Sequence, residues 1–139
     1  FLQLPPKAHR GRTIVRRLIL RKTFCGHSGA ITALAMASSY NILISGSEDK
    51  TAIVWDLTRL QFVRQLRDHV AGVSSVAVNN LTGDIVTCSR DVVYLWDING
   101  HLLATSNSNK GAGSHISCCT IRLAPKKKGE ERLGVQIGS

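Results

Sequence analysis

Short apolar runs alternate with polar clusters along the chain from Ala30 to Ser106. The runs are rich in Val, Ile, Leu and Thr and are bounded by Gly, Asn, Asp or Ser, which is typical of β-strands separated by turns. Some runs, such as Ile42-Leu43-Ile44 and Ile53-Val54-Trp55, are apolar throughout, which favours strands that are covered on both faces. The pattern predicts an all-β chain.

The predicted strands recur in a fixed order with a period of about 42 residues. His27 and His69 are 42 residues apart, and Trp55-Asp56 and Trp96-Asp97 are 41 residues apart. The matching segments are Ala30–Met36 with Gly72–Val78, Asn41–Asp49 with Gly83–Asp91, Ala52–Leu57 with Val93–Ile98, and Gln61–Leu66 with His101–Ser106. Each repeat therefore predicts a four-stranded antiparallel unit.

A period of this length, with Gly-His near its start and Trp-Asp near its end, resembles WD40 repeats, the blades of a β-propeller. The resemblance implies a partial propeller with two complete blades and parts of the flanking ones, cut from a longer array. We expect a basic linker and the last strand of a preceding blade (Thr13–Phe24) in residues 1–24, one repeat in 25–66, a degenerate repeat in 67–107, and a truncated repeat in 108–139, with strands at 114–123 and 132–139.

The WD40 resemblance also implies a hydrogen-bonded set of four side chains in the first repeat. His27 would bridge Asp49, and Ser45 would link to the indole of Trp55. Buried imidazole, hydroxyl and indole groups each need a partner, and a chain of them satisfies one another.

The second repeat departs from this arrangement. His69, Thr87, Asp91 and Trp96 hold the matching places, but Asp91 and Trp96 are five residues apart, whereas Asp49 and Trp55 are six apart. One missing residue would place Trp96 on the wrong side of the sheet unless the turn is shorter. We therefore do not expect a complete set in the second repeat.

His27, Asp49 and Ser45 could alternatively form a catalytic triad. However, no G-x-S-x-G motif accompanies them, and the same residue types recur at repeat spacing, which folding requires and catalysis does not. Neither a phosphate-binding loop nor a metal-ligand motif is present in the sequence. We expect a structural set in a non-catalytic protein without a cofactor, metal or small-molecule substrate.

Charge changes this picture only at the ends of the chain. The net charge is +9, but residues 25–107 carry five basic and seven acidic residues. The excess positive charge lies in residues 1–24 and 108–139, which include "APKKKGEER" (124–132). This leaves open an alternative function, a propeller in a nucleic-acid or ribonucleoprotein complex, or contact of the ends with anionic lipid. Steep loss of RNA or DNA binding with salt would favour the nucleic-acid alternative. We do not expect this alternative, because no aromatic residues lie among the lysines to stack on bases.

The four cysteines, Cys25, Cys88, Cys118 and Cys119, lack a CxxC spacing, so we expect reduced thiols buried in strands. A zinc site formed by His115, Cys118 and Cys119 is the alternative, and it lacks a second cluster of ligands. No apolar run is long enough to span a membrane and no secretory signal opens the chain. We expect a soluble, cytoplasmic protein.

A narrower resemblance lies in "NNLTGDIVTCS" and "YLWDINGHLLAT" of the second repeat and in "GSEDKTAIVWDLTRLQFVRQL" of the first. These segments resemble the C-terminal WD40 region of BEACH-domain proteins of the neurobeachin, lysosomal trafficking regulator and autophagy-linked FYVE type. The resemblance implies a scaffold in membrane trafficking, lysosome biology or selective autophagy, peripheral to endosomal, lysosomal or autophagic membranes through other domains. Proteins or peptides would bind on the propeller faces, and the loop residues that we expect to contact them are Tyr40, Glu48, Lys50, Arg59 and Arg90.

Overall fold

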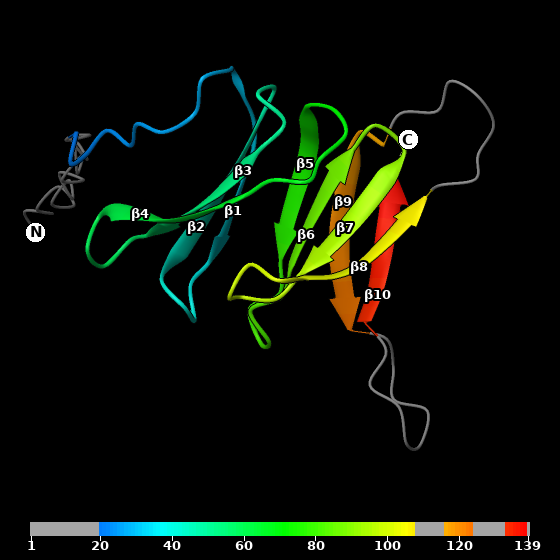
Figure 1. The fold of residues 1–139 in the computed structure, drawn as a ribbon. Coiled ribbons are helices and arrows are strands. Elements are labelled where there is room, and N and C mark those ends of the chain that lie inside the picture. Colours follow the sequence, from blue (N-terminus) through cyan, green and yellow to red (C-terminus); the bar gives the residue numbers. More distant parts are fainter. Residues whose placement is uncertain (1–19, 108–115, 124–132, 139) are drawn as a thin grey trace, which may run out of the picture.

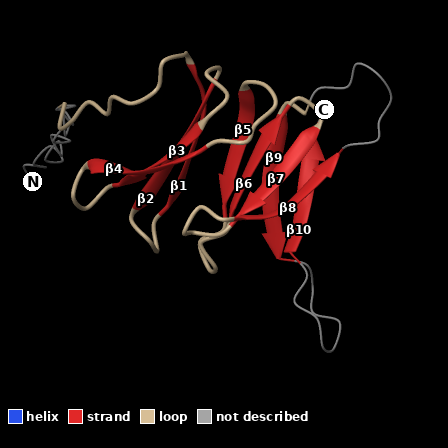
Figure 2. Ribbon diagram, viewed as in Figure 1, coloured by secondary structure: helices blue, strands red, loops and turns tan. Residues whose placement is uncertain are grey.

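The computed structural model describes residues 20–107, 116–123 and 133–138, and all regular structure in this part of the chain is β-strand (Figure 1, Figure 2). The strands are β1 (Ile31–Ala37), β2 (Ile42–Ser47), β3 (Ala52–Asp56), β4 (Gln61–Leu66), β5 (Val73–Val78), β6 (Ile85–Ser89), β7 (Val92–Trp96), β8 (Leu102–Asn107), β9 (Cys118–Leu123) and β10 (Leu133–Gly138). The prediction of an all-β chain is confirmed. A helix long and apolar enough to cross a membrane is not found among the described residues.

The strands form two antiparallel sheets and a hairpin. The first sheet has the order β1-β2-β3-β4, the second has the order β5-β6-β7-β8, and β9 pairs with β10. The three are stacked in chain order, with β5 between the first sheet and β9 (Figure 1). Each predicted repeat therefore supplies one sheet, as expected for stacked propeller blades.

The core lies between these layers, because the inner strands of each sheet turn buried side chains toward the neighbouring layer. The first sheet presents small side chains, Ala33, Ala35 and Ala37, to the second, which presents Tyr94 and Trp96. The small side chains of β1 allow this strand to approach β5 of the second sheet closely. A smaller apolar cluster joins the second sheet to the hairpin, and its members are Val86, Cys88, Val93, Ile116, Leu95, Cys119, Ile121 and Val135.

A hydroxyl group also links each layer to the next at equivalent positions. Thr32 and Ser74 lie at irregularities in the pairing of β1 and β5, where the register shifts. The Thr32 hydroxyl donates to the Val73 carbonyl of the second sheet, and the Ser74 hydroxyl donates to the Ile116 carbonyl at 2.8 Å. An extra residue in one strand turns its side chain out of the regular alternation, so the same local distortion supplies both links.

Two expectations from the sequence need correction. Residues 20–24 of the predicted strand at 13–24 are not in a strand, and residues 13–19 lie outside the described part of the chain. A strand needs a neighbour for its backbone hydrogen bonds, whereas Phe24 packs instead on the ring of Trp55, with ring centroids 5.0 Å apart. Of the cysteines, Cys88 is buried, but Cys25 lies outside any strand and is exposed, as is Cys118 in β9. Cys118 is exposed because alternate residues of a strand face opposite sides.

We expect the isolated chain to self-associate through the outer face of the first sheet. Ile31, Leu34 and Met36 are 50%, 63% and 58% exposed, whereas Val73 and Val76, the equivalents of Ile31 and Leu34 in the second sheet, are 1% and 7% exposed. Exposed apolar surface that is buried in the neighbouring repeat favours association. The double variant Leu34→Lys/Met36→Lys should shift the chain toward monomer in sedimentation velocity. A wild-type chain that is monomeric and unfolds cooperatively would contradict this expectation.

Candidate functional site

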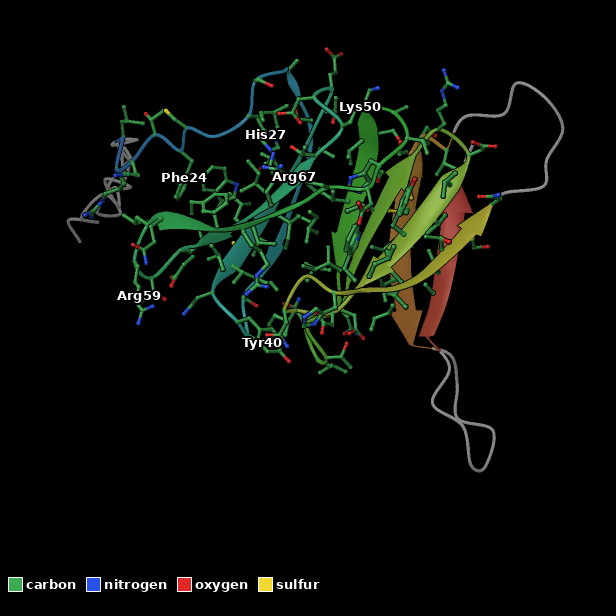
Figure 3. All side chains as sticks on the ribbon, in the orientation of Figure 1. Phe24, His27, Tyr40, Lys50, Arg59 and Arg67 are labelled. Atoms are coloured by element: carbon green, nitrogen blue, oxygen red, sulfur yellow. The ribbon has the colours of Figure 1, made fainter. Side chains whose placement is uncertain are left out.

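The four side chains of the predicted set in the first repeat lie together in the structure. His27, in the segment before β1, lies near the β2–β3 turn that carries Lys50 (Figure 3). Its Nδ1 atom is 2.9 Å from the Asp49 carboxylate and its Nε2 atom is 2.8 Å from the Ser45 hydroxyl. The Trp55 indole N–H donates to the same hydroxyl at 2.8 Å. The arrangement is satisfied when His27 carries its proton on Nδ1 and Ser45 donates to Nε2.

The Asp49 carboxylate is bonded to three residues. Besides His27, its carboxylate accepts hydrogen bonds from the backbone N–H groups of Ser28 (2.9 Å) and Thr51 (3.0 Å) and from the Thr51 hydroxyl (2.6 Å). Burial raises the pKa of Asp49, but the hydrogen bonds from Thr51, Ser28 and His27 outweigh it and hold the pKa well below its ordinary value. Asp49 therefore remains a carboxylate and fixes the β2–β3 turn.

The distances between Asp49, His27 and Ser45 are those of a catalytic triad, but the environment of Ser45 opposes nucleophilic chemistry. A nucleophile needs a free lone pair directed at the substrate. The Ser45 oxygen already accepts the Trp55 N–H, and Ser45 is 3% exposed. A cavity of about 670 Å³ lies between residues 20–29 and the first sheet, and its wall includes Phe24, Ile31, Leu34, Leu43 and Trp55. Apart from Phe24, which lies in the segment before β1, these residues form the outer face of the first sheet.

The second repeat builds a related set with a different fourth partner. The Thr87 hydroxyl is 2.7 Å from His69 Nε2 and accepts the Trp96 indole N–H at 2.9 Å. His69 Nδ1 lies 3.1 Å from the backbone carbonyl of Lys50, which belongs to the first sheet. Asp91, which holds the place equivalent to Asp49, is exposed in the β6–β7 turn. Desolvation lowers the pKa of His69 below its ordinary value, which agrees with a neutral ring that donates to a carbonyl.

The shorter turn explains how Trp96 reaches Thr87 despite the missing residue. Ser89 pairs with Val92, so only two residues form the β6–β7 turn, and Arg90 there has a positive φ of 56°. Thr87 pairs with Tyr94 just as Ser45 pairs with Ile53. Trp96 therefore follows the partner of Thr87 by two residues, as Trp55 follows the partner of Ser45. The missing residue shortens the turn, and the indole of Trp96 stays on the same face of its sheet as that of Trp55.

The five loop residues predicted to contact a partner lie at two opposite ends of the sheets. Glu48, Lys50 and Arg90 are exposed in the β2–β3 and β6–β7 turns, whereas Tyr40 and Arg59 lie in the β1–β2 and β3–β4 turns. Figure 3 shows Lys50 at one end and Tyr40 and Arg59 at the other. These residues therefore cannot all contribute to one small contact area.

Tyr40 also has a role inside the fold. Its hydroxyl donates to the Leu81 carbonyl of the second sheet at 2.8 Å, which ties the β1–β2 turn to the β5–β6 turn. Arg67, which the sequence did not single out, lies at the Lys50 end of the sheets and donates to the Gln65 side chain at 2.9 Å and 3.2 Å (Figure 3). Arg67 therefore adds a positive charge to the end formed by Glu48, Lys50 and Arg90, which we call the charged end.

The described residues contain no group of three His, Cys, Asp or Glu side chains close enough to hold a metal ion. His115, a ligand in the alternative zinc site, lies outside the described residues.

Comparison with known proteins identifies both repeats. The family model described as "WD domain, G-beta repeat" matches residues 19–56 and 60–97. The chain is 37% identical over 110 residues to human WD repeat- and FYVE domain-containing protein 4, and these residues cover 79% of the chain and 4% of that protein. It is 41% identical over 95 residues to BEACH domain-containing protein A2 of Arabidopsis thaliana, covering 68% of the chain and 3% of that protein.

A third relative is the human lysosomal-trafficking regulator, 33% identical over 113 residues, with 75% of the chain and 3% of that protein covered. The chain thus spans only a few per cent of the length of these relatives. The resemblance to BEACH-domain proteins that the sequence indicated is confirmed.

The fold has a solved counterpart in the WD40 repeats of RRP9, with a TM-score of 0.62 and 21% identity over 69% of the chain and 29% of that structure. This likeness supports the stacking of four-stranded sheets as propeller blades. Because the two matched repeats together cover more than half of its residues, the chain belongs to the WD40 family.

Proposed function

We propose that this chain is a non-catalytic protein-binding part of a BEACH-type scaffold and that a partner protein or peptide binds at the charged end. The observation that carries this proposal is the contrast between buried and exposed polar groups. The triad-like side chains bond to one another inside the fold, whereas Glu48, Lys50, Arg67 and Arg90 are exposed on turns held by two stacked sheets. Rigid turns that carry mixed charge provide a surface for selective recognition.

The cellular role that we propose is membrane trafficking, with lysosomal or autophagic functions included. Support comes from the name of one relative, the lysosomal-trafficking regulator. The chain would act in the cytoplasm, and other domains of the longer protein would supply contact with membranes. Neither a cofactor nor a small-molecule substrate is part of this proposal.

A comparison of the two ends of the sheets tests the binding proposal. The intact protein and two variants are compared by proximity labelling in cells, followed by cross-linking of each recovered partner to purified protein. The variant Glu48→Lys/Lys50→Glu/Arg90→Glu reverses three charges at the charged end. It should abolish direct cross-links to at least one partner, because reversed charge opposes association.

The control is Arg59→Glu at the opposite end of the first sheet, which should leave those cross-links intact. Both variants should keep the wild-type far-UV circular dichroism spectrum, since the substituted residues are exposed turn residues. The proposal is wrong if the triple variant keeps every partner, or if the partner that it loses is RNA or DNA whose binding falls steeply with salt.

A further inference from the structure

Two cysteines from sequence-distant strands meet between the second sheet and the hairpin. Cys88 in β6 is buried and belongs to the apolar cluster at this interface, and Cys119 in β9 packs against that cluster. The adjacent Cys118 is exposed on β9. Because neighbouring residues of a strand point to opposite faces, only Cys119 of this pair is directed at Cys88.

Ser75 fixes the position of Cys119 relative to Cys88. Ser75 in β5 is the pairing partner of Cys88, so their side chains lie side by side on one face of the second sheet. The Ser75 hydroxyl accepts the backbone N–H of Cys119 at 3.0 Å and lies 3.3 Å from its sulfur. One hydroxyl thus anchors both the backbone and the thiol of Cys119 beside the thiol of Cys88.

The two thiols differ in their tendency to ionise. The side-chain hydrogen bond with Cys88 lowers the pKa of Cys119, because this bond and that of Ser75 outweigh the opposing effect of burial. The same contact with Cys119, together with burial, raises the pKa of Cys88. Cys119 is also the more exposed of the two. One thiolate next to one thiol is the arrangement of an attacking and a resolving cysteine.

We propose that Cys88 and Cys119 form a peroxide-sensitive pair that closes to a disulfide and links β6 of the second sheet to β9 of the hairpin. The oxidant is a hydroperoxide, with hydrogen peroxide as the simplest member of the class.

The chemistry balances in two steps. The Cys119 thiolate attacks one peroxide oxygen, the O–O bond breaks, and hydroxide leaves as Cys119 becomes a sulfenic acid. The Cys88 sulfur then attacks the Cys119 sulfur, the S–O bond breaks, and the hydroxyl departs with a proton as water. The departing hydroxyl takes the Cys88 proton, and the proton that Cys119 released on ionising neutralises the hydroxide of the first step. Two thiols are oxidised by two electrons, and one hydrogen peroxide is reduced to two waters.

The disulfide would fix an interface that otherwise depends on a small apolar cluster and a few hydrogen bonds. The hairpin contacts the second sheet through that cluster, the Ser75 bonds to Cys119 and the Ser74 bond to Ile116. A covalent bond from β6 to β9 would hold the two layers in register, and a thiol reductant would release them.

Peptide mapping after oxidation tests the proposal. The intact native protein is treated with hydrogen peroxide, its free thiols are alkylated, and it is digested with trypsin. Cleavage after Arg67 and Arg90 releases peptide 68–90 with Cys88, and cleavage after Lys110 and Arg122 releases peptide 111–122 with Cys118 and Cys119. We expect a disulfide-linked pair of these peptides, with Cys119 as the bonded cysteine in more than nine-tenths of it. Protein oxidised in urea should use Cys118 and Cys119 in comparable amounts.

Matched variants distinguish the two adjacent cysteines. Cys119→Ser should reduce the linked pair at least tenfold, whereas Cys118→Ser should retain it, because Cys118 is exposed and faces away from Cys88. In the Cys118→Ser background, Ser75→Ala should raise the midpoint pH at which Cys119 is alkylated by iodoacetamide. Loss of the linked pair in Cys118→Ser, or identical products in native and urea-treated protein, would overturn the proposal. Cys118→Ser alone decides the matter if Cys119→Ser does not fold.

Discussion

Replacement of Thr87 by valine is expected to lower the free energy of unfolding of the second sheet by about 2–6 kcal/mol. Valine has the shape of threonine, so the change removes one hydroxyl without opening a cavity. That hydroxyl serves two buried partners, His69 Nε2 at 2.7 Å and the Trp96 indole N–H at 2.9 Å, and Thr87 itself is 0% exposed. Each partner left unsatisfied costs about 1–3 kcal/mol. Hydrogen exchange of β6 and β7 in the intact protein should accelerate by roughly 30-fold or more.

Thr105→Val in β8 is the matched control, because it makes the same chemical change in a strand of the same sheet. Thr105 is exposed and pairs with Tyr94 at the outer edge, so water replaces the lost hydroxyl contacts and exchange should change little. Equal acceleration in the two variants would show that loss of the Thr87 bonds is not what destabilises the sheet.

The fold could be predicted from the sequence because the two repeats of the chain can be compared with each other. A run such as Ile42-Leu43-Ile44 fits a buried strand or a short helical segment equally well. Its recurrence within a unit that also repeats His27 and Trp55 removes that ambiguity, since one unit of about 42 residues must bury its faces against the next. Strand boundaries in the two sheets accordingly agree with the matched segments to within a few residues.

The neighbour of His69 could not be predicted in the same way, because it is a backbone carbonyl. Comparison of the repeats indicates Asp91, and the shortened turn gives no information about a replacement. The carbonyl of Lys50 reaches His69 because Lys50 ends a turn with a positive φ of 67° in the first sheet. Any residue type supplies a carbonyl, so the position carries no sequence signal. The contact depends on how two sheets stack.

The exposure of Cys25 and the contact between Cys88 and Cys119 could not be predicted from the sequence for a related reason. Cysteine is usually buried in strands, but which face of a strand it occupies depends on register, and register depends on the neighbouring layer. Cys118 and Cys119 are the same residue type and adjacent in sequence, yet only Cys119 lies at the interface between the second sheet and the hairpin.

The two hydrogen-bonded sets stabilise different parts of the fold. The His27 set closes within the first repeat through Asp49, so it holds the β2–β3 turn against the segment before β1. The His69 set ends on Lys50 of the first sheet, so it also holds two sheets together. Lys50 lies in the turn that Asp49 organises, which makes the second set dependent on the first.

Asp49→Asn is expected to destabilise the first sheet by about 3 kcal/mol at pH 7. Both oxygens of Asp49 accept hydrogen bonds. In either orientation of an asparagine side chain, its NH₂ group would therefore face N–H or O–H groups of Ser28, Thr51 or His27. The pair is buried, with side-chain exposures of 4% for His27 and 9% for Asp49. Hydrogen exchange of β2 and β3 should accelerate roughly 100-fold. Because His69 hydrogen-bonds the Lys50 carbonyl, exchange in β6 should also rise.

Asp97→Asn provides the control for burial. Asp97 lies 2.9 Å from His101 Nδ1, the same separation as in the buried pair, but His101 is 76% exposed and Asp97 26% exposed, so exchange should stay close to wild type.

The effect of Asp49→Asn should also depend on pH in a defined direction. The pKa of Asp49 is lowered on folding from an ordinary value of 3.8, so the carboxylate stabilises the fold fully above that pH and loses this contribution as pH falls below it. The difference between wild type and Asp49→Asn should therefore be constant from pH 7 to about pH 5 and shrink below 3.8. A difference that persists unchanged at lower pH would mean that the variant acts through packing of the turn and not through the charge.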